Sequence, residues 1–193
     1  MLEIRDLRLE DEDFILDGDM RLVGDTKIEN GSLIVSGDLV LAETEECLPS
    51  LEIIGGNLTA GSLWTEDKMG RTPQEQICTY FHVDGDIHIT NGAFYIGECE
   101  IVHADDIIIE DGDLVCGGIA EASSLYVSGD IDSSDSINVL FDIFCHSAEV
   151  YGATYCGRDL YAEDYYDTHK YIIFVKGSFK TNDLYNPGQI EIG

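Results

Sequence analysis

A short segment that recurs along the chain restricts its possible folds more than any other feature. Residues 32–41, SLIVSGDLVL, return at residues 124–131 as SLYVSGDI. The shared unit is an apolar residue, a spacer, Gly, Asp or Asn, and a second apolar residue. The first three copies are spaced by 19 residues each, and the six clearest copies have their glycine at Gly18, Gly37, Gly56, Gly85, Gly112 and Gly129. A period of this kind indicates a structure in which one repeat stacks on the next.

Alternating apolar residues flank each copy, as in Leu33-x-Val35, which predicts short strands with one buried face. Gly and Asp between them are typical of tight corners, since Gly accepts positive φ and Asp can bond nearby backbone. A repeat of about 19 residues suits one coil of a parallel β-helix. We therefore predict an all-β, single-stranded parallel β-helix (solenoid) of roughly 8–10 coils. The copies should occupy the same corner of successive coils, with Leu39, Ile87 and Ile131 pointing inward.

Two regions depart from the period within what we predict to be a single domain over residues 1–193. An interval between neighbouring Gly units grows to 29 residues, which predicts an insertion loop at about 64–78. Insertions in solenoids form loops on one face, often the binding face. The Tyr-rich region at about 151–193 should be irregular, with residues 164–170 as a protruding loop.

Composition limits the partners that this chain can have. Its 193 residues are 44% hydrophobic, which predicts a folded core, but 10 Lys and Arg stand against 39 Asp and Glu, a formal charge of −29. Nucleic acid and anionic membranes are therefore not expected partners, since phosphate binding relies on basic side chains. The sequence shows neither a secretory leader nor an 18-residue apolar run, so we expect a soluble, cytoplasmic protein.

Motifs of catalysis and cofactor binding are missing from the sequence, which contains no G-x-S-x-G, P-loop or G-x-G-x-x-G. Corner chemistry accounts for the Gly-Asp carboxylates. The five histidines lack a third nearby ligand, and the six cysteines, without any C-x-x-C pair, resemble reduced core residues. We expect no enzyme activity, no metal and no cofactor.

Binding to a basic protein remains the function that the charge favours. Carboxylates would steer such a partner, while Trp, Tyr, Met and Arg are residue types enriched at interface centres. The partner-binding residues that we predict are Trp64, Met69, Arg71, Glu43, Glu45, Glu46, Asp105, Asp106, Tyr165 and Tyr166.

Two resemblances suggest what such a protein does. The Val-x-Gly-Asp-Ile/Leu units at 35–39, 83–87 and 127–131 resemble coils of bactofilins, polymer-forming β-helical proteins of bacteria, over about residues 15–150. The acidity and lack of catalytic motifs are similar to bacterial immunity proteins, which block a toxin, and to acidic pentapeptide solenoids, which mimic DNA. We expect an acidic, immunity-type inhibitor of a basic partner such as a toxin or nuclease. The alternative is a self-assembling, bactofilin-like structural scaffold.

Overall fold

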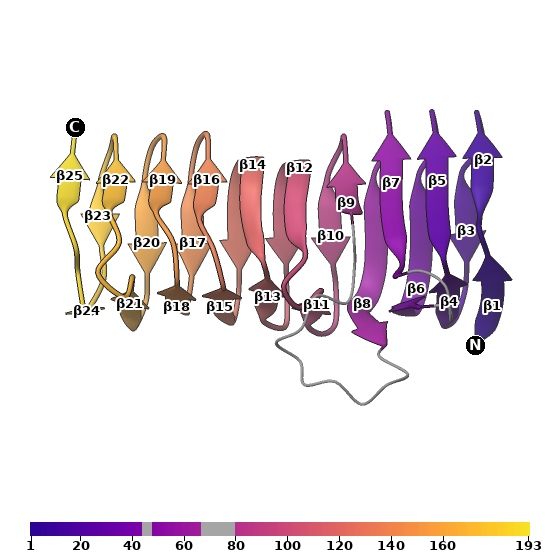
Figure 1. Cartoon of the computed structure of the whole chain (residues 1–193), viewed down its shortest axis with the longest axis horizontal. Coiled ribbons are helices and arrows are strands. Elements are labelled where there is room, and N and C mark those ends of the chain that lie inside the picture. Colours follow the sequence, from indigo (N-terminus) through magenta and orange to yellow (C-terminus); the bar gives the residue numbers. More distant parts are fainter. Residues whose placement is uncertain (44–47, 67–79) are drawn as a thin grey trace.

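The computed structural model describes residues 1–43, 48–66 and 80–193 and confirms the predicted class. Within these residues there is no helix, and every strand pairing is parallel, forming a solenoid of about nine coils. The coils stack into a rod with the N-terminus near one end and the C-terminus near the other (Figure 1). None of the described segments is a helix long and apolar enough to cross a membrane.

Each coil has three sides, so the rod has three faces. Face 1 contains β1 (Leu2–Arg5), β4 (Met20–Val23), the second halves of β6 (Leu33–Ala42) and β8 (Leu58–Glu66), β11 (Phe94–Tyr95), β13 (Leu114–Cys116), β15 (Asp130–Ser133), β18 (Ser147–Val150), β21 (Tyr165–Asp167) and β24 (Asp183–Tyr185).

Face 2 contains β2 (Arg8–Glu10), β5 (Asp25–Glu29), β7 (Ser50–Ile54), β9 (Tyr80–Val83), the first halves of β12 (Glu100–Ile109) and β14 (Gly118–Val127), β16 (Ile137–Val139), β19 (Thr154–Cys156), β22 (Ile173–Val175) and β25 (Ile190–Ile192). Face 3 contains β3 (Phe14–Leu16), the remaining halves of β6, β8, β12 and β14, β10 (Ile87–Ile89), β17 (Ile143–Cys145), β20 (Leu160–Ala162) and β23 (Phe179–Lys180).

Inward side chains of successive coils form apolar ladders that fill the rod. Leu39, Ile87 and Ile131 are all at most 1% exposed, so the prediction that they point inward is confirmed. Leu39 and Ile131 belong to one ladder on face 1, whereas Ile87 pairs with Leu58 and Ile107 on face 3. The prediction that all three lie at equivalent corners was therefore wrong for Ile87.

The Gly-Asp unit recurs at two different corners. The segments 32–41 and 124–131 both pass from face 3 to face 1, as predicted for copies at one corner. The units at Gly56 and Gly85 instead join face 2 to face 3. The reason is that each corner separates two short strands, so the same strand-corner-strand chemistry fits more than one corner.

The Asp side chain of one coil contacts the Gly-Asp unit of the next coil, which accounts for the Gly there. Asp19 Oδ1 accepts a hydrogen bond from the Asp38 amide (3.2 Å), and Asp113 Oδ1 accepts one from the Asp130 amide (2.8 Å). A Cβ added to the adjacent Gly37 would overlap the Asp19 carboxylate. Gly37 does not have positive φ, so its role here is to leave room for the carboxylate of the preceding coil.

The Tyr-rich C-terminal region differs from the irregular structure that we predicted, because β19 to β25 continue the parallel pairing. Segment 164–170 is not a protruding loop, since residues 165–167 form β21. Tyr166 is fully buried and lies next to Ala148 in the face 1 ladder, with its hydroxyl 2.9 Å from Thr154 Oγ1. The small Ala148 side chain leaves space for the Tyr166 ring, so this bulky residue can occupy the inward position of β21.

The cysteines and the predicted insertion are described only in part. Cys99, Cys116, Cys145 and Cys156 are free and buried, as expected for core residues, and burial raises the pKa of the Cys116 and Cys145 thiols to about 12. Cys47 and Cys78 lie outside the described residues. Of the predicted loop at 64–78, residues 64–66 form the end of β8, and the rest lies outside the described residues.

Candidate partner-binding surface

The predicted binding residues do not form one surface. Trp64 and Tyr165 are both on strands of face 1, β8 and β21, and are half-buried, whereas Asp105 and Asp106 lie at the corner between faces 2 and 3. Glu43 and Tyr166 are only 5% and 0% exposed, so direct contact of these two side chains with a partner does not fit this structure. The remaining predicted residues, Glu45, Glu46, Met69 and Arg71, lie outside the described residues.

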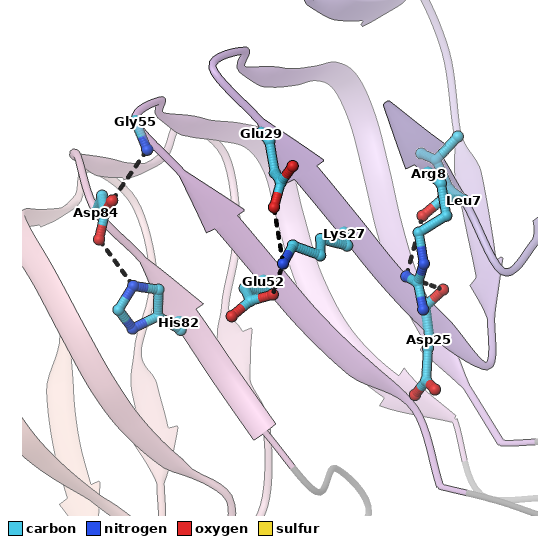
Figure 2. A network of polar contacts seen from close by, with 9 residues as sticks. All are labelled: Leu7, Arg8, Asp25, Lys27, Glu29, Glu52, Gly55, His82 and Asp84. Carbon is cyan, nitrogen blue, oxygen red and sulfur yellow. Dashed lines mark hydrogen bonds and ion pairs between the residues drawn. The ribbon is translucent and has the colours of Figure 1, made fainter. Parts of the chain in front are cut away.

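Face 2 carries a polar ladder near the N-terminus whose side chains form ion pairs and hydrogen bonds with their neighbours (Figure 2). Arg8, Lys27, Glu52 and His82 are successive partners in its register. Lys27 Nζ lies 2.8 Å from Glu29 and 3.1 Å from Glu52, and its pKa is raised, mainly by Glu29 and then by Glu52.

Further hydrogen bonds occupy the two ends of this ladder. The Arg8 guanidinium donates to the Leu7 and Asp25 carbonyl oxygens (3.3 and 3.1 Å). The His82 ring lies 2.8 Å from Asp84, and this hydrogen bond is the main cause of the lowered pKa of the Asp84 carboxyl. Lys27 thus offsets part of the negative charge of Glu29 and Glu52, so this part of face 2 attracts a basic partner less than unpaired carboxylates would.

Face 1 has Arg ion pairs near the N-terminus, and its outward ladder changes character further along the rod. Near the N-terminus, Arg21 pairs with Glu3 and Glu66, each at 2.7 Å. The outward ladder then becomes apolar and aromatic, running through Val40, Trp64, Tyr95 and Val115. Val40 is buried, and the other three side chains are half-buried.

Three carboxylates follow directly in the same ladder. Asp132 pairs in register with Val115 on one side and Glu149 on the other, and Glu149 pairs with Asp167. We call Asp132, Glu149 and Asp167 the acidic ladder. Among the described residues, no Lys or Arg forms an ion pair with any of them. The pKa of Asp132 is raised, first by partial burial and then by repulsion from Glu149, although His169 opposes the shift.

Aromatic side chains surround the acidic ladder. The Tyr165 hydroxyl donates to Glu149 Oε1 (3.4 Å), and His169 Nε2 lies 4.0 Å from Glu149 Oε2. The Tyr151 ring stacks on His169 with 3.8 Å between ring centroids. Burial and then the Glu149 charge raise the pKa values of Tyr151 and Tyr165. The surface therefore combines concentrated negative charge with aromatic rings, a combination that can accept Lys or Arg side chains.

Sequence reasoning missed the acidic ladder, although the sequence contained a signal for it. Asp132, Glu149 and Asp167 are spaced by 17 and 18 residues, which is the length of one coil in this part of the chain. A search for acidic residues repeated at the coil period, instead of runs of adjacent acidic residues, would have found it. No group of His, Cys, Asp and Glu that could hold a metal ion occurs in the described part of the chain.

Comparisons with protein-family models, with curated proteins and with solved structures found no match to this chain. The solenoid class is confirmed by the structure itself. The resemblances to bactofilins and to immunity proteins receive no support from these comparisons and stay predictions from the sequence.

Proposed function

We propose that this chain is an acidic protein-binding module that holds a basic partner, such as a toxin or nuclease, on face 1 and thereby acts as an immunity-type inhibitor. The observation that carries the proposal is the acidic ladder, three carboxylates in successive coils without a Lys or Arg ion pair among the described residues. Their mutual repulsion is relieved when cationic side chains of a partner approach.

The two parts of face 1 have different roles in this proposal. Trp64 lies three coils from Asp132 in the same ladder, a distance of about 14 Å at the usual strand spacing. One partner patch of standard size, about 800 Å² per side, is large enough to cover both parts. The acidic ladder would mainly raise the association rate, while Trp64 and Tyr165 would slow dissociation by burying aromatic surface.

The experiment starts from capture of host proteins on the immobilised full chain, followed by purification of the captured protein and kinetics with defined variants. The test variant is Asp132→Asn with Glu149→Gln, and the matched control is Glu12→Gln with Asp111→Asn, which removes the same charge from exposed sites elsewhere. We expect the test variant to lower the association rate at least about fivefold more than the control does, and added salt to remove that difference.

Inhibition is measured separately, as loss of the partner's activity in the presence of the wild-type chain. A captured partner that is acidic, or one whose binding responds equally to both double variants, would contradict the face 1 proposal. Recovery of the chain itself as the sole partner, together with elution in the void volume of a sizing column, would favour the scaffold alternative instead.

A further inference from the structure

Face 3 carries an outward ladder without carboxylates along almost the whole rod, in a protein whose formal charge is −29. Successive coils contribute one side chain each, and we call the first eight of them the face 3 stripe: Ile15, Ile34, Thr59, His88, Ile108, Tyr126, Phe144 and Tyr161. All six residues of the stripe that are neither Thr nor His are half-buried or exposed. Ile15 is 71% exposed, Tyr126 39% and Phe144 40%.

The aromatic end of the stripe is ordered by contacts between neighbouring coils. The Phe144 and Tyr161 rings stack with centroids 4.9 Å apart. Lys180, the next residue in the ladder, places its ammonium 4.8 Å from the Tyr161 ring centroid. These contacts hold the rings side by side along the face, so this end of the stripe is already organised before a ligand arrives.

Carboxylates border the stripe on both sides. At the corner with face 2, five coils have an acidic residue directly before the first inward side chain of face 3: Asp13, Asp86, Asp106, Asp142 and Asp159. At the corner with face 1, the borders are formed by Asp17, Glu110 and Glu163, all exposed. The face thus has a largely apolar centre, in which Thr59 and His88 are the polar members, between two rims with acidic residues. Three of the rim carboxylates have a partner within the chain: Glu110 with His88, Glu163 with His146 and Asp142 with Arg158.

We infer that the face 3 stripe is a docking surface for a cationic amphipathic helix, one with an apolar stripe bordered by Lys or Arg on both sides. Charge complementarity selects this occupant. A second copy of the chain would bring acidic rims against acidic rims, and an anionic lipid surface would be repelled in the same way. A helix with basic borders places apolar side chains on the stripe and a cation over each rim.

The dimensions of the stripe agree with a helix of ordinary length. Eight coils at about 4.8 Å give seven steps and roughly 34 Å, which a helix of about 22 residues spans at 1.5 Å per residue. This surface is separate from the acidic ladder of face 1, so the inference does not rest on the proposed function and can fail without it.

The test uses a fluorescein-labelled 22-residue peptide of Leu and Lys, designed as a helix with one apolar stripe between two Lys rows. Its control is a peptide of the same composition in an order that has no apolar face. Anisotropy titrations are made with the full chain, at peptide concentrations where sedimentation shows the peptide to be monomeric. The test variant is Tyr126→Ser with Phe144→Ser. The matched control is Tyr155→Ser with Tyr171→Ser, which removes two exposed tyrosines away from face 3.

We expect the amphipathic peptide to bind at least about tenfold more tightly than its reordered control, and the face 3 double variant to lose at least about tenfold of that affinity. The Tyr155 and Tyr171 variant should bind as the wild type does, and circular dichroism checks that both variants keep their strand content. Equal binding of the two peptides would show simple charge attraction and overturn the inference. A salt-promoted dimer that the face 3 variant dissociates would also overturn it, because a second copy would then be the occupant.

Discussion

Leu39 is the residue at which the interior ladder of face 1 is most simply tested, since it is fully buried between Met20 and Leu63. We expect Leu39→Ala to lower the free energy of unfolding by about 2 to 5 kcal/mol, because it removes buried methyl groups and leaves a cavity. Urea unfolding followed by circular dichroism measures the change. Ile15→Ala, at a 71% exposed position, is the control and should change stability by less than about 0.5 kcal/mol. Equal effects would mean that the inward and outward assignments are wrong.

Asp132 and Asp84 should respond to pH with opposite signs. The folded-state pKa of Asp132 is raised above its unfolded value. Between these two pKa values the folded chain binds more protons than the unfolded chain, so stability falls as pH rises. The folded-state pKa of Asp84 is lowered, mainly by His82, so its contribution is present above the unfolded pKa and is lost as pH falls.

We therefore expect Asp132→Asn to stabilise the protein near neutral pH and Asp84→Asn to destabilise it. Each effect should stay below about 1 kcal/mol, because solvent screens these side chains. Urea unfolding near pH 7 and again near pH 3, where a free Asp is mostly protonated, gives both signs. A destabilised Asp132→Asn would show that the acidic ladder is not a site of repulsion.

Single residues were the scale at which the sequence was least informative about the candidate site. Adjacent acidic residues such as Asp105 and Asp106 were predicted to bind a partner, yet in this fold negative charge accumulates between residues that are one coil apart. Tyr166 was predicted to contact a partner because Tyr is common at interfaces, but alternation in β21 turns it inward beside Ala148. Which of two neighbouring tyrosines points outward depends on the strand register, and the weak repeat there did not specify it.

The corner between two strands is the element that the sequence described best, although for an incomplete reason. Gly and Asp were expected to shape a local turn, whereas the structure shows the carboxylate bonding to the next coil. In the row at the corner of faces 2 and 3, Asn57 Oδ1 accepts the Asp86 amide (2.9 Å) and Asp86 Oδ1 accepts the Asp106 amide (3.1 Å). A contact between coils cannot be derived from a local motif, because it depends on which residues the stacking places above one another.

Two substitutions of Asp86 distinguish the contribution of this hydrogen bond to stability from that of the negative charge. Asp86→Ala removes the acceptor of the Asp106 amide and should cost about 1 kcal/mol of unfolding free energy. Asp86→Asn keeps an acceptor oxygen, as Asn57 does in the same row, and should stay within about 0.5 kcal/mol of wild type. Faster hydrogen exchange at the Asp106 amide in the Ala variant alone would locate the effect. Similar losses in both variants would show that the hydrogen bond is not the stabilising contact.

At the scale of the whole molecule, the solenoid class and the number of coils could be predicted from the repeat period, and the structure has about nine coils where 8–10 were predicted. The face that would bind a partner did not follow from it. All three faces share the same inward alternation and differ in their outward ladders. Face 2 has paired charges near the N-terminus and Asn138, Tyr155 and Phe174 further along, face 1 has an apolar and then an acidic ladder, and face 3 has the stripe without carboxylates. Those differences emerge only when residues one coil apart are placed side by side.

The net charge of −29 predicts that the stability of the chain without a partner depends on salt. Like charges are closer together in the folded rod than in the unfolded chain, so self-repulsion destabilises the fold at low ionic strength. Raising NaCl from about 0.05 to 0.5 M shortens the Debye length to a few ångströms, and we expect the thermal midpoint to rise by several degrees. The control is Asp132→Asn with Glu149→Gln, which removes two of the charges and should start from a higher midpoint and gain less from salt. A midpoint that falls with NaCl would mean that the ion pairs of faces 1 and 2, such as Arg21 with Glu66 and Lys27 with Glu52, contribute more to stability than the surplus negative charge costs.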